Sequence, residues 1–90
     1  MSHAVVLHVE LPPIDPDEGQ RMLDEDVVPA TSSQAGFQKG LWIDLGDFKG
    51  MAVVVFDTEA NAEAAKAAVA PPPGGPKVIS IGVHRVAAEA

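Results

Sequence analysis

The chain of 90 residues contains no cysteine and no tyrosine. Without cysteine it has no disulfide bonds, no thiolate metal ligands and no cysteine nucleophile. Its stability must therefore come from packing or from association. A domain of this size buries only about 60 to 65% of the surface that its unfolded chain exposes, so buried area from a partner would help. We expect a single domain over residues 1–90, with an ordered core over about residues 4–86.

Basic residues are also scarce. Lysine and arginine together number 6 against 13 aspartates and glutamates, which gives a formal net charge of -7. A phosphate backbone is bound by clusters of basic residues, so we expect no nucleic-acid partner. No apolar run approaches the roughly 18 residues of a membrane span, and no basic segment precedes a hydrophobic signal core at the N-terminus. We therefore expect no membrane association and a cytoplasmic location.

The first half of the chain predicts a strand followed by a helix. The run Ala4–Leu11 is typical of a strand, with one face formed by Val5, Leu7, Val9 and Leu11 and the other by Ala4, Val6, His8 and Glu10. The Pro12–Pro13 pair ends the strand, because proline cannot donate a sheet hydrogen bond. The Asp15–Pro16 pair is suited to cap and begin a helix. Either Pro29 or the Thr31–Ser33 run is expected to end it.

The second half predicts a hairpin with its turn at Gly46–Asp47, then a helix capped by Thr58, then a last strand. The Pro71–Pro76 run is expected to end the helix. The expected ranges are Phe37–Leu45 and Lys49–Phe56 for the hairpin, Glu59 to about Ala70 for the helix, and Lys77–Val86 for the last strand.

The resulting order, βαββαβ, predicts an α+β fold of the ferredoxin-like type, in which both helices lie on one face of a four-stranded antiparallel sheet. The run Met51–Phe56 is apolar on both strand faces, and Val6 lies opposite the best core positions of its own strand. Such strands suit a sheet that is covered on both sides. Since two helices cover only one side, we predict a homodimer formed through the other sheet face.

The segment Gly36–Trp42, with Pro29 before it and Val54–Ala62 after it, resembles the dimeric α/β-barrel superfamily over nearly the whole chain. Within that superfamily the likeness is to small antibiotic-biosynthesis-monooxygenase-like proteins, many without an assigned activity. The resemblance implies two ferredoxin-like subunits whose sheets pack into a barrel with the helices outside. The superfamily includes cofactor-independent oxygenases, haem-degrading enzymes, lactone isomerases and proteins without demonstrated catalysis, so the fold does not select a reaction.

Two departures narrow what the resemblance implies. Haem-degrading relatives combine an asparagine on the first strand with a histidine on the second helix. This chain has no asparagine over Ala4–Leu11 and no histidine over Glu59–Ala70. The oxygenases use asparagine, tryptophan, tyrosine or arginine around a phenolic substrate. This chain has no tyrosine, and its only asparagine, Asn61, matches no catalytic position. Haem degradation is therefore disfavoured, and no cofactor is predicted.

His8 and His84 are the candidate catalytic residues. Both occupy even positions in strands that the topology places side by side, so their imidazoles are candidates to line one cavity and to move a proton near neutral pH. A metal would need a third ligand, for which Glu10, on the same strand face as His8, is the only obvious neighbour. Polar residues of a dimer interface are the alternative interpretation, and no metal site is predicted. His3 is expected to be disordered.

Trp42 and Arg85 are the candidate substrate-binding residues. Trp42 offers a flat surface and one N–H donor to an aromatic substrate, and its alternative role is packing. Arg85 stands near the end of the last predicted strand, where it is a candidate to bind an anionic substrate or to pair with a carboxylate. Phe37 is expected to anchor the core on the strand face opposite to Trp42.

Two functions are consistent with these residues. In the first, a cavity between sheet and helices binds a hydrophobic or aromatic small molecule, which undergoes cofactor-independent monooxygenation or isomerisation. Trp42 would position the substrate, and His8 or His84 would move a proton. In the second, the homodimer is a non-catalytic module that binds a ligand, stabilises a partner or has a stress-related structural role. The two differ in whether Trp42, His8 and His84 border one cavity.

Overall fold

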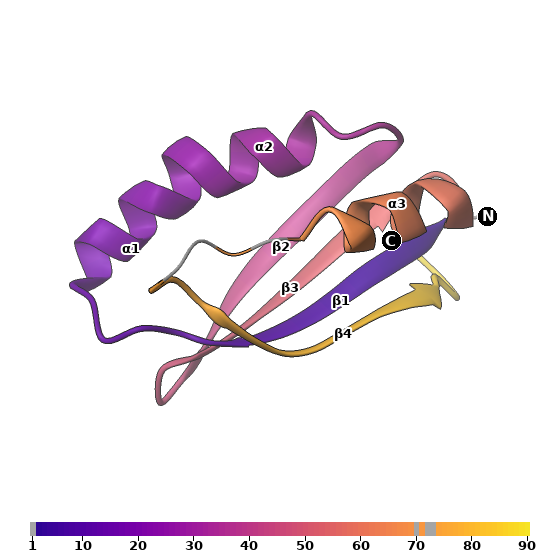
Figure 1. The fold of residues 1–90 in the computed structure, drawn as a ribbon. Coiled ribbons are helices and arrows are strands. Elements are labelled where there is room, and N and C mark those ends of the chain that lie inside the picture. Colours follow the sequence, from indigo (N-terminus) through magenta and orange to yellow (C-terminus); the bar gives the residue numbers. More distant parts are fainter. Residues whose placement is uncertain (1, 70, 72–73) are drawn as a thin grey trace.

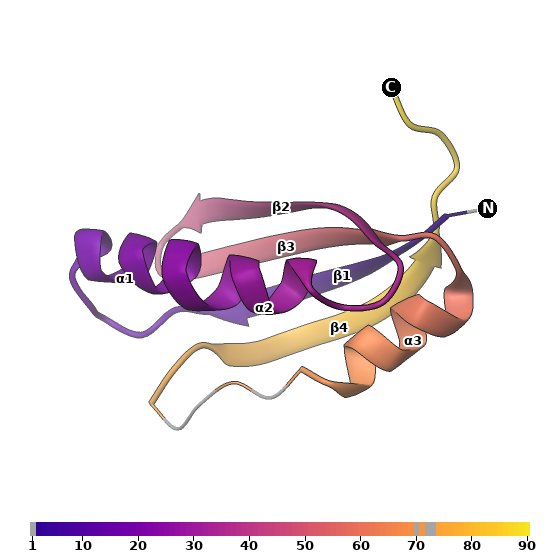
Figure 2. The ribbon, with the colours of Figure 1, turned by 90° about the horizontal axis from the view of Figure 1, so that it is seen from above.

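The computed structural model describes residues 2–69, 71 and 74–90 and has an α+β fold (Figure 1). Its four strands form one antiparallel sheet in the order β2-β3-β1-β4, which is compatible with a ferredoxin-like fold. Figures 1 and 2 show the helices on one side of the sheet. The elements are β1 (His3–Glu10), α1 (Pro16–Met22), the π-helical segment η1 (Leu23–Val27), α2 (Val28–Ser32), β2 (Phe37–Gly46), β3 (Lys49–Phe56), α3 (Glu59–Ala67) and β4 (Lys77–Arg85).

The two faces of the sheet are covered differently. On the helix face, Ala62 and Ala65 of α3 pack in one cluster with Val54 and Phe56 of β3. Alternate residues of each strand point away from this cluster and form what we call the open face. By strand the open face consists of Ala4, Val6 and His8; Lys39, Leu41, Ile43 and Leu45; Met51, Val53 and Val55; and Ser80, Gly82 and His84.

The first helix begins as the sequence predicts. The Asp15 carboxylate accepts a hydrogen bond from the backbone N–H of Asp17 at 2.8 Å, and Pro16 occupies the first turn. Further along, hydrogen bonding to Glu18 raises the pKa of Arg21, which also pairs with Glu25. None of α1, η1 and α2 contains a buried residue, and α2 is the part that contacts the sheet, at β2. This helix is therefore attached to the sheet mainly through its C-terminal end.

Pro29 does not end the helix, which continues to Ser32, so the Thr31–Ser33 alternative is the one confirmed. Proline lacks an N–H and cannot donate to the carbonyl four residues earlier. The helix widens just before it, and the N–H of Val28 donates to the carbonyl of Leu23, which is the five-residue spacing of a π-helix. The π-helical segment thus accommodates Pro29 without a break.

The second strand departs from simple alternation near its start. Phe37 pairs with Phe56, but Lys39 pairs with Val55, so a β-bulge shifts the register at Gln38. The bulge brings Phe37 onto the same face as Trp42, and both pack against the core cluster. The expectation that Phe37 and Trp42 lie on opposite faces was therefore wrong. The rings of Phe37 and Phe56 meet edge to face with their centroids 6.3 Å apart.

The hairpin turn lies one residue later than expected, at Asp47 and Phe48, which both have positive φ. The Thr58 hydroxyl accepts a hydrogen bond from the N–H of Asn61 at 3.1 Å and caps α3, as predicted. The helix ends at Ala67, before the Pro71–Pro76 run, of which Pro72 and Pro73 lie outside the described residues.

Both ends of the described chain are tied to the sheet. His3 begins β1 and its imidazole lies 3.2 Å from the carboxylate of Glu59, so the expectation that it is disordered was wrong. Residues 86–90 form a C-terminal tail, which Figure 2 shows passing the ends of the other strands toward β2. Its Glu89 pairs with Lys39 at 3.5 Å, and the N–H of Val86 donates to the carbonyl of Ser2.

Within the described ranges, none of the helices combines the length and the apolar character that crossing a membrane requires.

Candidate functional site

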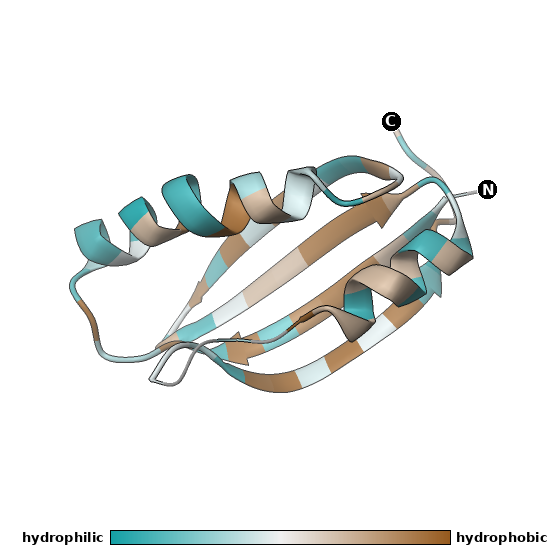
Figure 3. Ribbon diagram, turned by 45° about the horizontal axis from the view of Figure 1, so that its top comes forward, coloured by the Kyte–Doolittle hydropathy of each residue, from teal (hydrophilic) through white to brown (hydrophobic). Residues whose placement is uncertain are grey.

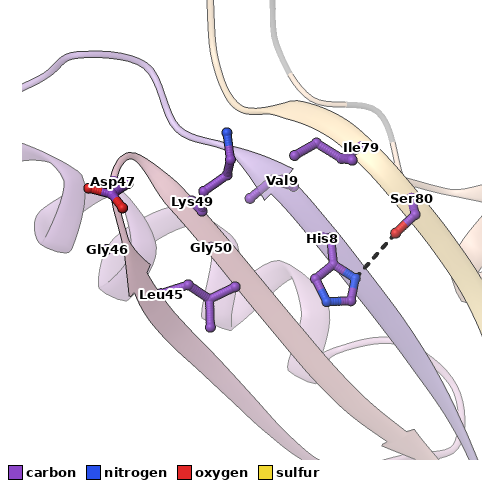
Figure 4. Close-up of a pocket in the computed structure, with 9 residues that line it drawn as sticks. All are labelled: His8, Val9, Leu45, Gly46, Asp47, Lys49, Gly50, Ile79 and Ser80. Carbon is purple, nitrogen blue, oxygen red and sulfur yellow. Dashed lines mark hydrogen bonds between the residues drawn. The ribbon is translucent and has the colours of Figure 1, made fainter.

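The polar side chains of the open face lie along β1 and β4. The register pairs His8 with Ser80, and His8 Nδ1 lies 3.2 Å from the Ser80 hydroxyl (Figure 4). The pair belongs to the same regular register that places Ala4 opposite His84. A β-bulge follows it, because Val9 pairs with Val78 and leaves Ile79 as the extra residue. The prediction that these two strands are neighbours is confirmed. The serine partner was not predicted, although Ser80 stands four residues before His84 on the same strand and therefore shares its face.

His8 and Ser80 border a cavity of about 340 Å³ at one end of the open face (Figure 4). Leu45 of β2 and Ile79 of β4 contribute apolar walls, and both side chains are exposed. The remaining lining residues are Val9, Gly46, Asp47, Lys49 and Gly50. The cavity therefore combines apolar walls with a hydrogen-bonded imidazole and hydroxyl, which is a chemistry suited to a small, largely apolar ligand with one polar group.

His84 shares the open face with His8 but stands opposite Ala4, so the two histidines lie at different levels of the same strand pair. A Cβ atom placed on Gly82 would come within 2.9 Å of His84 Nε2. The imidazole of His84 is therefore laid back along β4 over Gly82, toward Ser80. His84 does not line the cavity that contains His8.

Trp42 lies on the other side of the sheet. It pairs with Ala52 and packs against the core cluster below the helices. A Cβ atom placed on Gly40 would lie 2.8 Å from its ring, so the indole covers Gly40. The sheet thus separates Trp42 from both histidines, and the three do not border one cavity within a protomer. A second cavity, of about 180 Å³, lies on the helix side and is lined by Gln34, Ala35, Asn61, Ala64, Ala65 and Ala68.

Arg85 ends β4 and is paired in register with His3, on the same side as Phe56 rather than beside His84. Arg85 takes part in interactions within the folded chain, so its guanidinium is not an unpaired cation. Its binding role stays a prediction. The arrangement does not bring Arg85 to the cavity that contains His8.

The structure does not assemble a metal site from these residues. Among the residues that it describes, no group of three or more histidine, aspartate and glutamate side chains is placed to hold a metal ion. Glu10, the ligand that the sequence offered beside His8, pairs instead with Lys49 at 3.6 Å. Both side chains of this pair are about half exposed.

Asn61 has a structural role that the sequence did not reveal. Its amide donates to the Asp57 carboxylate at 2.8 Å, and the N–H of Asp57 donates to the carbonyl of Gly36 at 2.9 Å. These bonds tie the turn before β2 to the start of α3. Gly36, within the segment that carries the resemblance, therefore has a structural role in this turn.

No model of a known protein family matches this chain, and no curated protein matches it significantly.

Proposed function

We propose that this protein is a homodimeric binding module of the dimeric α/β-barrel type, formed by the packing of two open faces. The observation that carries the proposal is the apolar character of that face. Leu41, Ile43 and Leu45 of β2 are 61%, 42% and 51% exposed, and Val6 and Val53 beside them are half-buried. Figure 3 shows how strongly the apolar residues concentrate in the strands.

The exposed area supports the same arrangement. The chain exposes 5816 Å², whereas a compact monomer of 9.3 kDa exposes about 5,000 Å². The surplus of roughly 800 Å² is about one partner's share of a standard interface. Part of it belongs to the exposed C-terminal tail, and the open face supplies the apolar part. A second copy of the chain offers a surface of the same kind, as a two-fold interface requires.

We propose binding rather than catalysis as the main role, because the candidate catalytic residues are divided by the sheet. Trp42 is occupied in packing under the helices, and His8 and His84 are on the open face. A hydrophobic small molecule fits the cavity beside His8, which the second copy would help to enclose. The resemblance to antibiotic-biosynthesis-monooxygenase-like proteins then concerns architecture more than activity.

One observation favours a catalytic alternative: the hydrogen bond between His8 and Ser80 beside a cavity of about 340 Å³. With its other nitrogen, His8 could accept a proton from an apolar substrate in a cofactor-independent oxygenation or isomerisation. The direct assay is oxygen uptake and product formation with a dihydroxynaphthalene, comparing the wild type with His8→Gln. Turnover that depends on His8 would replace the binding role with catalysis, and no turnover would remove this class of substrate.

The dimer is tested by placing a charge on the open face. Leu41→Asp puts a carboxylate at an exposed site, so the protomer should fold while the apolar interface would have to bury an unpaired charge. We expect light scattering after gel filtration to give twice 9.3 kDa for the wild type at micromolar concentration. For the variant we expect a dissociation constant at least about 100-fold higher.

The matched control is Val27→Asp on η1, where the valine is 41% exposed and lies outside the open face. This variant should keep the wild-type dissociation constant. A monomeric wild type, or equal losses in both variants, would contradict association through the open face.

A further inference from the structure

The open face is not uniformly apolar. Its β2 and β3 strands contribute leucine, isoleucine, methionine and valine, whereas β1 and β4 contribute a strip of polar and small residues. We call this the histidine strip; it comprises His8, Ser80, Gly82 and His84. His8 is half-buried and bonded to Ser80, and the exposed imidazole of His84 lies over Gly82, toward the same serine. Two of the three histidines of the chain thus lie on the surface proposed to meet a second copy.

We propose that the histidine strip makes the association of two copies pH-dependent, with a stable dimer near neutral pH that dissociates as the histidines take up protons. This inference rests on the proposed packing of two open faces. Histidine is the side chain that ordinarily changes charge between about pH 5 and 8. An uncharged imidazole can be buried with its hydrogen bonds satisfied, whereas an imidazolium against an apolar sheet loses hydration that the surface does not replace.

The charged groups around the strip do not offer a ready counter-charge. Glu10 lies two residues beyond His8 on β1, but it pairs with Lys49 of β3 and stands opposite Lys77 of β4. On β3 the neighbour of His8 in register is Met51. Asp47, in the hairpin turn, lines the far side of the cavity and is exposed to water.

At the His84 end of the face, the charged groups are also paired. Lys39 of β2 and Glu89 of the tail form an ion pair at 3.5 Å. His84 itself faces Ala4 across β1 and Gly82 along β4. The strip therefore has no described carboxylate placed against it that would hold a protonated imidazole in a buried interface.

A second electrostatic effect has the opposite sign. Each protomer carries a formal charge of -7, so protonation lowers the long-range repulsion between two copies and favours association. This repulsion acts through solvent and is screened beyond about 8 Å at physiological ionic strength. Desolvation of an imidazolium within the interface is not screened in this way. We therefore expect the local effect to exceed the long-range one, and the sign of the pH response distinguishes the two.

Linkage gives the expected size. Dissociation of the dimer is expected to take up protons. For each proton taken up, the dissociation constant rises tenfold for every unit by which the pH falls below about 6.5, the ordinary pKa of histidine. Between about pH 7.5 and 5.5 we therefore expect the dissociation constant of the wild type to rise at least about tenfold. The response should be larger if both histidines of each protomer are buried.

The experiment measures the dissociation constant by sedimentation equilibrium at the two pH values for the wild type, His8→Gln, His84→Gln and the double variant. Glutamine keeps hydrogen-bonding capacity without a charge. His3→Gln is the matched control, because His3 points to the helix face and contacts Glu59. Circular dichroism at both pH values establishes that each protein is folded. If the double variant is not folded, the two single variants provide the test.

The proposal is supported if the dissociation constant rises at the lower pH in the wild type and in His3→Gln. The rise should be smaller in the two single variants and less than about twofold in the double variant. A wild-type dimer that is equally stable at both pH values, or tighter at the lower one, overturns it. So does a response that survives replacement of both histidines. A wild type that is monomeric at neutral pH rejects the proposed dimer itself, which is a separate outcome.

Discussion

At the scale of single residues, a glycine two positions before a flat ring occurs in two strands of this protein. Trp42 lies over Gly40 on the helix face, and His84 lies over Gly82 on the open face. Residues two apart on a strand share a face, and a glycine leaves room for the ring to lie along the strand. The same arrangement of glycine and ring thus places a tryptophan against one face of the sheet, under the helices, and a histidine against the opposite face.

Gly36 is a position where any larger residue should be costly. Its φ is +79°, and an added Cβ atom would overlap the Asp57 carboxylate and the Asn61 amide, which are hydrogen-bonded to each other. We expect Gly36→Ala to lower the free energy of unfolding by at least about 2 kcal/mol, through backbone strain and the displacement of both side chains. Urea unfolding followed by circular dichroism measures the loss.

Gly46→Ala separates the two causes. Gly46 has nearly the same φ, +80°, but an added Cβ atom would meet nothing within 4 Å. Its substitution should therefore cost only the backbone strain, about 1 kcal/mol. Equal losses at Gly36 and Gly46 would show that the contacts with Asp57 and Asn61 do not matter.

Residue alternation predicted the face of some side chains but not of others. His8 and His84 share a face as expected, because the register that pairs β1 with β4 is unbroken from the Ala4–His84 pair to the His8–Ser80 pair. Phe37 and Ile79 lie next to bulges, and their faces could not be predicted by counting along the strand. A bulge depends on the competition between neighbouring hydrogen-bond patterns, for which a single sequence carries little signal.

At the scale of elements, the two helical segments differ in what they hold together. α3 buries Ala62 and Ala65 against the sheet, whereas α1, η1 and α2 bury no residue. Both begin with a capping side chain, Thr58 for α3 and Asp15 for α1. Equal capping chemistry therefore serves one helix that belongs to the core and one that lies mostly outside it.

We expect the two caps to contribute unequally to global stability. Thr58→Ala should lower the free energy of unfolding by about 1 kcal/mol, because the start of α3 frays and with it the core contacts. Asp15→Ala should lower it by less than about 0.5 kcal/mol, because α1 can open without exposing a buried side chain. Chemical denaturation and amide hydrogen exchange of the two variants provide the comparison. Equal losses would indicate that α1 is part of the cooperative core.

Most element positions were accessible from the sequence, because proline, glycine and capping residues mark them. The beginnings of α1, β3 and α3 were predicted to the residue by Pro16, Lys49 and Glu59. The π-helical segment was not predicted, since Pro29 could equally have ended the helix. The helix continues to α2, which contacts β2, and a tertiary contact of this kind is not contained in local propensity.

At the scale of the whole molecule, the protomer has a small core, in which Phe56 is the largest fully buried side chain among the described residues. A dimer would add buried apolar area that the protomer does not provide for itself. Folding and association would then be linked, and the apparent stability would depend on protein concentration. The C-terminal tail occupies one end of the same face, where Ala4 and Val55 are already buried.

The position of Trp42 has a practical consequence for spectroscopy. The chain has one tryptophan and no tyrosine, so its intrinsic fluorescence excited near the indole band reports a single site. That site is on the helix face, which dissociation of two open faces would leave intact. Separation of the copies should hardly change the emission maximum, whereas unfolding should shift it to longer wavelengths as the indole meets water. One native fluorophore thus distinguishes loss of structure from loss of a partner.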